Sequence, residues 1–250
     1  MKLLDLFSGI GGFSLGLERA GFETVAFCEN HPFRRGILAQ RWPGVPIYED
    51  ICTLTAERLA GDGISIDAIC GGFPCQDLSR ANGVWSSRPG LEGARSGLWS
   101  EYARLIRELR PRVAIVENVP DLLACLGVVL GDLAACGYDA EWDCLQTTVV
   151  GGRCPRDRVW VVSYPGSERL DGQHGEGLAE GNAGGVFDDL ARSEPRPTSW
   201  QDWLSEPAIP RVVNGTPNRM DRIRRTESIG NAVVPQIAEV LGRSIMRALA

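Results

Sequence analysis

Short apolar runs alternate with segments of helical period along the first half of the chain, and this alternation restricts the fold more than any other feature. The runs that we predict as strands cover residues 2–7, 23–28, 46–48, 64–70 and 113–116. The segments that we predict as helices lie at residues 13–20, 32–43 and 98–109. Strands and helices that alternate in this way form a parallel sheet with helices on its faces. The sequence therefore predicts an α/β fold with a doubly wound sheet.

The second half of the chain is less regular. A helix is predicted over residues 122–135, strands over 138–145 and 159–163, and a final helix from about Pro235. Residues 166–197 are rich in glycine, which is typical of a flexible surface insert. The polar connection over residues 77–98 is long, and long connections in compact domains are usually lids or binding loops.

A glycine-rich turn joins the first predicted strand to the first helix. It reads Phe-Ser-Gly-Ile-Gly-Gly over residues 7–12, and such a turn lets a ligand approach the backbone at a helix N-terminus. Glu29 ends the second strand, where an acidic residue suits hydrogen bonds to ribose hydroxyls. Asp50 and Ile51 follow the third strand and could hold an adenine. Position 14 is serine, so the turn lacks the third glycine that is typical of nicotinamide and flavin sites.

Cys75 follows the fourth predicted strand in the sequence Gly-Gly-Phe-Pro-Cys-Gln, residues 71–76. The glycines and the proline break the strand and leave one thiol at its carboxyl end, where ligands bind in parallel α/β sheets. A thiol in this position can act as a nucleophile. The chain has eight cysteines but no Cys-x-x-Cys pair and only two histidines, so we predict no metal site. The other cysteines are interpreted as small apolar residues in a reducing compartment.

Glu117 and Asn118 stand at the end of the fifth predicted strand. The carboxyl ends of parallel strands meet at one edge of the sheet, so Glu117 should lie near Cys75, Glu29 and the glycine turn. Each of these features alone would be unremarkable, and their convergence on one edge predicts a ligand site there.

Composition sets broad limits on location and partners. The 250 residues suit one domain, or one domain with a small appendage, and no apolar run is long enough to span a membrane. The first residues lack the apolar core of a secretion signal, so we expect a cytoplasmic protein. The net charge is −6, but arginines cluster at residues 153–158 and 211–225, where they could face phosphates or simply form solvated surfaces.

Five motifs, in order, resemble those of the DNA cytosine-C5 methyltransferase family. Residues 5–12 resemble its S-adenosylmethionine loop, 72–76 its nucleophile motif and 117–119 its cytosine-binding motif. Residues 95–98 and 230–233 are similar to two further motifs, and order and spacing match over residues 1–164 and 226–250. The resemblance implies a Rossmann-like methyltransferase domain formed by these two segments. Residues 165–225 would form a small target-recognition region.

The same resemblance implies the chemistry and the residues that perform it. A thiolate would add to C6 of a cytosine that has left the DNA helix, and C5 would then accept the methyl group of S-adenosylmethionine. The implied catalytic residues are Cys75, Glu117 and Arg158. The implied cofactor-binding residues are Phe7, Ser8, Gly9, Gly11, Glu29, Asn30, Asp50, Ile51, Pro74, Asn231 and Ala232. The implied substrate-binding residues are Gln76, Ser79, Asn118 and Arg156.

Two features depart from the family pattern, and several alternatives stay open. The usual Pro-Gln pair before the Arg-Asp-Arg element at residues 156–158 reads Arg153-Cys154, and the recognition region is short. A tRNA cytosine methyltransferase on the same scaffold is the main alternative to a DNA enzyme. A silent DNA-binding module and a nicotinamide oxidoreductase are further alternatives. For the DNA enzyme we expect a monomer whose partner is double-stranded DNA. Whether a cognate restriction endonuclease exists is left open by the sequence.

Overall fold

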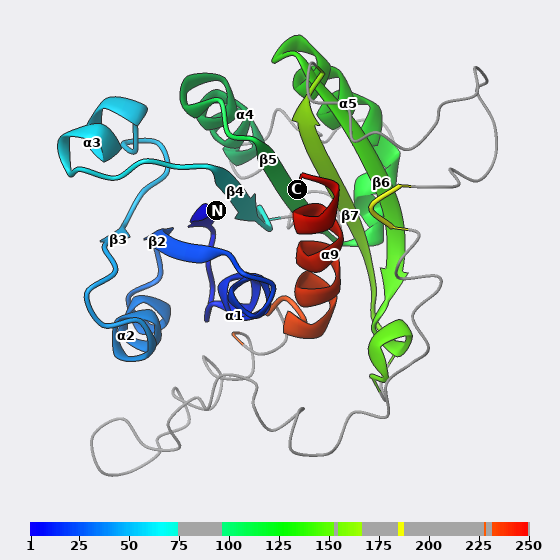
Figure 1. The fold of residues 1–250 in the computed structure, drawn as a ribbon, viewed down its shortest axis with the longest axis horizontal. Helices are drawn as coiled ribbons and strands as arrows, with labels where there is room; N and C mark the ends of the chain where they lie inside the picture. The colour runs from blue at the N-terminus through cyan, green and yellow to red at the C-terminus, as the bar shows by residue number, and fades with distance from the viewer. Residues whose placement is uncertain (75–96, 153–154, 167–184, 188–227, 229–231, 250) are drawn as a thin grey trace, which may run out of the picture.

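The protein contains a seven-stranded sheet with helices on both faces (Figure 1). The computed structural model describes residues 1–74, 97–152, 155–166, 185–187, 228 and 232–249. The strand order is β3-β2-β1-β4-β5-β7-β6. The strands are β1 (Lys2–Leu6), β2 (Glu23–Cys28), β3 (Ile47–Tyr48), β4 (Ala68–Gly71), β5 (Val113–Asn118), β6 (Tyr138–Gln146) and β7 (Asp157–Pro165).

The helices follow the strands in the predicted alternation. The α-helices are α1 (Gly12–Arg19), α2 (Pro32–Arg41), α3 (Ala56–Gly61), α4 (Leu98–Leu109), α5 (Leu126–Ala135) and α9 (Pro235–Ala248). The part of the chain that the structure describes also contains the 3-10 helices η1 (Pro120–Cys125) and η2 (Thr147–Val150). The short α3, which begins after the cap Thr55, is absent from the sequence prediction, and the predicted helix over 122–135 begins with the 3-10 turn η1.

Strands β1 to β5 pair in parallel, which confirms the α/β prediction. Strand β7 runs antiparallel to both β5 and β6, so a hairpin completes one edge of the sheet. The strand predicted over residues 64–70 is shorter than expected, because only Ala68–Gly71 pairs with β1 and β5.

Both faces of the sheet are buried, and β5 shows why. Ala114 and Val116 pack into one cluster with residues of α4 and α5, whereas Val113 and Ile115 pack into a second with residues of α1 and α9. Neighbouring residues of a strand point to opposite faces, so a continuous apolar run suits a sheet that is covered on both sides. The carboxyl ends of the central strands are thereby fixed in a rigid frame.

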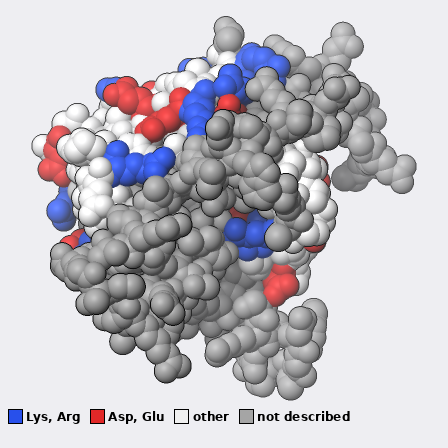
Figure 2. Space-filling view, turned by 90° about the horizontal axis from the view of Figure 1, so that it is seen from below, with Lys and Arg blue, Asp and Glu red and all other residues white. Residues whose placement is uncertain are grey.

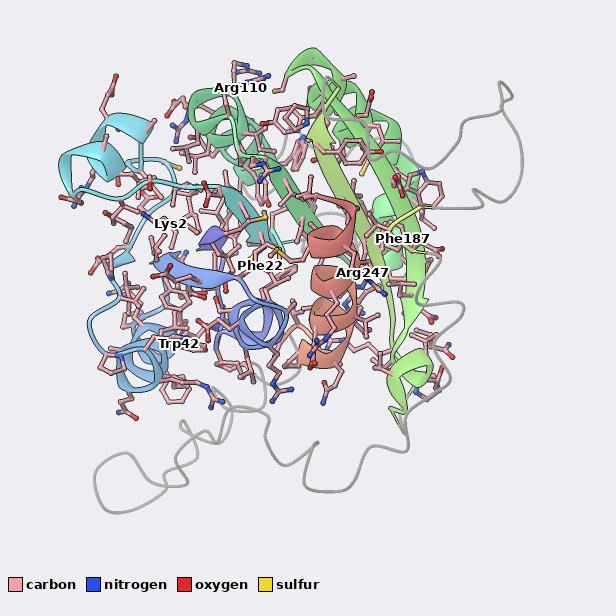
Figure 3. The ribbon with its side chains drawn as sticks, viewed as in Figure 1. Lys2, Phe22, Trp42, Arg110, Phe187 and Arg247 are labelled. Atoms are coloured by element: carbon pink, nitrogen blue, oxygen red, sulfur yellow. The ribbon has the colours of Figure 1, made fainter. Side chains whose placement is uncertain are left out.

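Helices α1 and α9 lie side by side although they come from opposite ends of the sequence (Figure 1). Gly16 on α1 permits the close contact, because an added Cβ would overlap the carbonyl oxygen of Pro235 and lie 2.8 Å from the Cβ of Ala238. Trp42, which is labelled in Figure 3, follows α2 and donates from Nε1 to the Glu18 carboxylate on α1 at 2.8 Å. Helix α1 is therefore held from two sides.

A buried carboxylate joins β1 to α1. Asp5 is fully buried, and its Oδ2 accepts hydrogen bonds from the hydroxyl of Ser14 at 2.7 Å and from the amide of Ser14 at 3.3 Å. Gly11 provides no side-chain cap for α1, so Asp5 supplies an acceptor for a first-turn amide. Burial raises the pKa of Asp5 to about 7, although the Ser14 bonds and the Cys70 thiol act against this rise.

Three further features of the sequence can be compared with the described residues. Cys28, Cys70 and Cys136 are buried, but Cys52 and Cys144 are exposed, so the small apolar interpretation is wrong for those two. Of residues 165–225, the structure describes only 165–166 and 185–187. No helix in the described part of the chain combines the length and the apolar character that crossing a bilayer needs.

The contact between α1 and α9 predicts opposite effects for two glycine substitutions. Gly16→Ala should destabilise the protein by about 1–3 kcal/mol, because the new methyl group has no space. Gly36→Ala on α2 is the matched control, since no atom lies within 4 Å of its Cβ position, and it should stabilise the helix by about 0.5–1 kcal/mol. Urea unfolding measures both, and equal midpoints would contradict the packing described.

Asp5 predicts a pH dependence of stability. Between about pH 4 and pH 7 the folded protein holds the Asp5 proton while the unfolded chain loses it, so the unfolding free energy falls as pH rises. Asp5 alone should lower the unfolding free energy by about 1.4 kcal/mol for each pH unit in this range. Asp5→Asn should lose this slope, and the exposed control Asp139→Asn should keep it. Urea unfolding over this range measures the slopes, and the same slope in Asp5→Asn and wild type would contradict the assignment.

Candidate active site

The strand ends enclose one cavity of about 320 Å³. Its wall is formed by the β1–α1 turn, the ends of β2 and β3, the turn after β4, the end of β5 and the start of β7. The predicted site residues that line it are Phe7, Gly9, Glu29, Asn30, Asp50, Ile51, Pro74, Glu117, Asn118, Arg156 and Arg158. Residues far apart in the sequence thus meet at one edge of the sheet.

The glycine turn presents some of its residues to the cavity and uses others for support. Phe7 and Gly9 line the cavity, and Phe7 has a φ of 51°, which costs a residue other than glycine about 1–3 kcal/mol. Ser8 is buried instead, and its hydroxyl donates to the Asp5 carbonyl at 2.6 Å. Gly11 lies against the Trp42 ring, which fills the space that a Cβ would need. Ser8 and Gly11 shape the turn but do not line the cavity.

Glu29 lies at the end of β2 with only 3% of its surface exposed. Its Oε2 accepts from the Gly9 amide at 2.8 Å, and its Oε1 accepts from the His31 amide at 2.8 Å. Arg34 lies 3.6 Å from the same carboxylate. A carboxylate accepts up to about four hydrogen bonds, so Glu29 keeps capacity for hydroxyl groups of a ligand.

Asp50 and Ile51 form a further part of the wall. Ile51 is buried, whereas Asp50 is exposed and accepts from the Cys52 amide at 2.9 Å. An apolar side chain beside a carboxylate suits a ligand that has a flat ring with hydrogen-bond donors. The carboxylates of Glu29 and Asp50 beside the apolar Ile51 fit an adenosine-containing cofactor.

Glu117 forms an ion pair at the opposite side of the cavity. Its Oε1 lies 2.9 Å from Nε of Arg158 on β7. A Cβ on residue 72 would lie 2.8 Å from Glu117 Oε2, so a side chain there would displace the carboxylate from this position. Burial raises the pKa of the Glu117 carboxyl, and the positive charges of Arg158 and Arg156 act against the rise.

Asn118 fixes the turn that follows β4. Its Nδ2 donates to the carbonyl of Phe73 at 3.1 Å, and its Oδ1 accepts from the Val119 amide at 2.9 Å. Pro74 is the last residue described on this turn. The predicted site residues Cys75, Gln76 and Ser79 come next and lie outside the described residues, as does Asn231.

Arg156 connects β7 to the segment that leads into α9. Its Nη1 donates to the carbonyl of Ala232 at 2.7 Å, and Ala232 itself does not line the cavity. Ser228, which lines the cavity, is missing from the sequence prediction although it lies two positions before Gly230 in the C-terminal motif. Cys28, Arg34 and Glu49 also line the cavity without having been predicted, and no sequence motif marks them. Leu98, a further lining residue, was not predicted as a site residue although it ends the motif over residues 95–98.

Within the described ranges, no group of three His, Cys, Asp or Glu side chains could hold a metal ion. Charged groups do gather on the outer surface. Figure 2 shows separate groups of Lys and Arg on the face seen from below in Figure 1, with Asp and Glu beside them.

Comparison with known proteins gives consistent results. The profile of the family described as C-5 cytosine-specific DNA methylase matches residues 1–195. The Type II methyltransferase M2.BsuMI of Bacillus subtilis is 41% identical over 172 residues, which cover 65% of this chain and 42% of the relative. M.NgoFVII of Neisseria gonorrhoeae, also a Type II methyltransferase, is 33% identical over 190 residues, which cover 70% of this chain and 46% of that relative. The chain therefore spans less than half the length of these curated relatives.

Solved structures agree with the fold. A candidate DNA modification methyltransferase encoded within an Escherichia coli prophage has a TM-score of 0.58 and 28% identity, covering 69% of this chain and 49% of that one. Spodoptera frugiperda DNMT2 has a TM-score of 0.54 at 20% identity, and the match covers 66% of this chain and 50% of that one. This likeness concerns the fold alone. The family profile covers most of the sequence, and the strand-end motifs surround one cavity. The chain belongs to the C-5 cytosine-specific DNA methylase family.

Proposed function

We propose that this protein is a DNA (cytosine-5-)-methyltransferase that methylates C5 of a cytosine in a specific duplex DNA site, with S-adenosylmethionine as the methyl donor. The observation that carries the proposal is the shared cavity. It has Phe7, Gly9 and Glu29 on one side, and Glu117, Arg158 and the turn that leads to Cys75 on the other. Such a cavity suits a reaction in which two ligands must meet.

The cofactor side would use the residues described above. When bound, S-adenosylmethionine supplies an electrophilic methyl group on a sulfonium. Glu29 would accept hydrogen bonds from the ribose hydroxyls, and Asp50 and Ile51 would hold the adenine. Phe7 and Gly9 would lie along the rest of the molecule, with Asn30 and Pro74 at its edges and Asn231 closing the site. Ala232 would act indirectly, through the bond that its carbonyl accepts from Arg156.

Cys75 would be the nucleophile on the substrate side. Its thiolate adds to C6 of the cytosine, and the Glu117 carboxyl gives a proton to N3, so electron density reaches C5 and C5 takes the methyl group. The C5 proton then leaves to a base, the thiolate is eliminated, and N3 returns its proton to the Glu117 carboxylate, which leaves 5-methylcytosine and S-adenosylhomocysteine. Burial of Glu117 supports this role, because it favours the protonated carboxyl that the step requires.

The remaining polar residues would bind the base and the DNA backbone. Arg158 lies against Glu117 and would contact the cytosine O2 or a phosphate, with Arg156 beside it. Asn118, Gln76 and Ser79 would hold the base and its neighbours. Flipping the base out of the duplex costs a few kcal/mol in lost stacking and pairing, and the contacts with these side chains would offset that cost.

We further propose that the enzyme acts as a monomer in the cytoplasm and that residues 165–225 contain the target-recognition region. The Type II names of its relatives support a role beside a cognate restriction endonuclease. Double-stranded DNA is the proposed partner.

Bisulfite sequencing of DNA from cells that express the protein tests the proposal. We expect methylated cytosine at one short sequence, and none in cells that express Cys75→Ser, whose binding of S-adenosylhomocysteine should stay close to wild type because the thiol is not needed for it. Calorimetry with the purified variant measures that binding. Unmethylated DNA together with methylated tRNA would contradict the proposal and favour the RNA alternative, and full methylation by Cys75→Ser would exclude the thiol mechanism.

A further inference from the structure

Arg104 on α4 makes four polar contacts with its guanidinium group. Nε donates to Glu101 at 2.7 Å and Nη1 donates to Glu108 at 2.7 Å, both on the same helix. Nη2 leaves the helix and donates to the carbonyls of Ile51 and Leu54, each at 2.9 Å. The two carboxylates orient the guanidinium, and the two carbonyls belong to a different part of the fold.

Those carbonyls lie in the segment between β3 and α3, which carries Asp50 and Ile51 of the cavity wall. Its internal backbone hydrogen bonds are long, at 3.2 Å from the Thr53 amide to Asp50 and 3.3 Å from the Leu54 amide to Ile51. The two contacts from Arg104 are shorter than these backbone–backbone bonds and as short as the bond from the Cys52 amide to the Asp50 carboxylate at 2.9 Å. Glu108 adds a further contact by accepting from the Ala56 amide at 3.1 Å.

The same helix also contacts the other side of the cavity. Trp99 on α4 packs against Phe73, with ring centroids 5.5 Å apart, and Phe73 precedes Pro74 in the turn that leads to Cys75. Leu98 lines the cavity itself. Helix α4 thus connects the wall at Asp50 and Ile51 with the turn after β4.

An arginine between two glutamates on a helix surface usually forms two exposed ion pairs, each of which stabilises the helix by a few tenths of a kcal/mol. That account leaves the two carbonyl contacts unexplained. Only a planar guanidinium can reach two carbonyls and two carboxylates at once, whereas a lysine ammonium is a compact charge with three donors.

We propose that Arg104 is a positioning residue for the cofactor: it holds the segment from Ile51 to Leu54, and with it the wall that receives the adenine. The proposal rests on the function proposed above, because it requires that S-adenosylmethionine binds in this cavity. Arg104 acts through the segment and does not line the cavity itself.

Arg104→Lys tests the proposal, with S-adenosylhomocysteine as the probe in titration calorimetry. The variant keeps a positive charge between the glutamates but loses the paired carbonyl contacts, so its dissociation constant should rise about tenfold. The KM for the methyl donor should rise in parallel, while kcat at saturating donor and the KM for DNA should stay unchanged. A purely structural role would lower thermal stability without this selective change.

Two further variants serve as controls. Arg107→Lys changes an exposed arginine on the same helix and should bind the probe like wild type. Glu101→Gln removes one negative charge but keeps a side-chain oxygen that can accept from Nε of Arg104, so the guanidinium should keep its orientation and the variant should bind the probe like wild type. A tenfold loss in Glu101→Gln would overturn the proposal, because charge on α4 would then control the affinity, and this result does not depend on the folding of Arg104→Lys.

Unchanged affinity in folded Arg104→Lys would overturn the positioning role while leaving the proposed function intact. Failure of the wild-type protein to bind S-adenosylhomocysteine would overturn the proposed function, and the positioning role with it.

Discussion

The close approach of two parallel strand ends is the constraint on which the site depends. Gly72 follows β4 without a side chain, and the Glu117 carboxylate at the end of β5 occupies the space that a Cβ would need. The register that pairs Gly71 with Val116 sets this approach. Asn118 then bonds to Phe73 and fixes the turn that leads to Cys75. A thiol and a carboxyl from two strands can act on one base only if these turns stay close together.

The two carboxylates of the cavity have different surroundings. Each carboxylate oxygen of Glu29 accepts a hydrogen bond from one backbone amide. These bonds orient the carboxylate, which can then accept further hydrogen bonds from hydroxyl groups. Glu117 is buried beside Arg158. Burial raises the pKa of this carboxyl while the ion pair with Arg158 acts against the rise, so its proton affinity depends on both effects. In the proposed function, Glu29 would be the acceptor for the cofactor and Glu117 the proton donor for the cytosine.

Sequence periodicity was sufficient to predict the sheet and the edge where its polar residues meet. Buried parallel strands appear in the sequence as apolar runs, and the polar motifs follow directly after these runs. Features that depend on the reach of side chains were not predictable. Arg104 reads as a helix-surface residue, and its contacts with Ile51 and Leu54 arise only when α4 packs beside that segment. The antiparallel direction of β7 and the short α3 carry no comparable pattern. Ser8 and Gly11 fit the motif, but the fold uses them as support for the turn.

The account requires a covalent bond between the Cys75 sulfur and a pyrimidine ring. The most direct measurement uses duplex DNA in which the target cytosine is replaced by 5-fluorocytosine, incubated with the protein and S-adenosylmethionine. Fluorine at C5 cannot leave as a proton, so elimination of the thiolate should stop and a denaturation-resistant complex should accumulate. Peptide mass spectrometry should then find the modified base on the peptide that contains Cys75. A complex linked through another residue, or methylation of normal DNA without any trapped complex, would contradict the account.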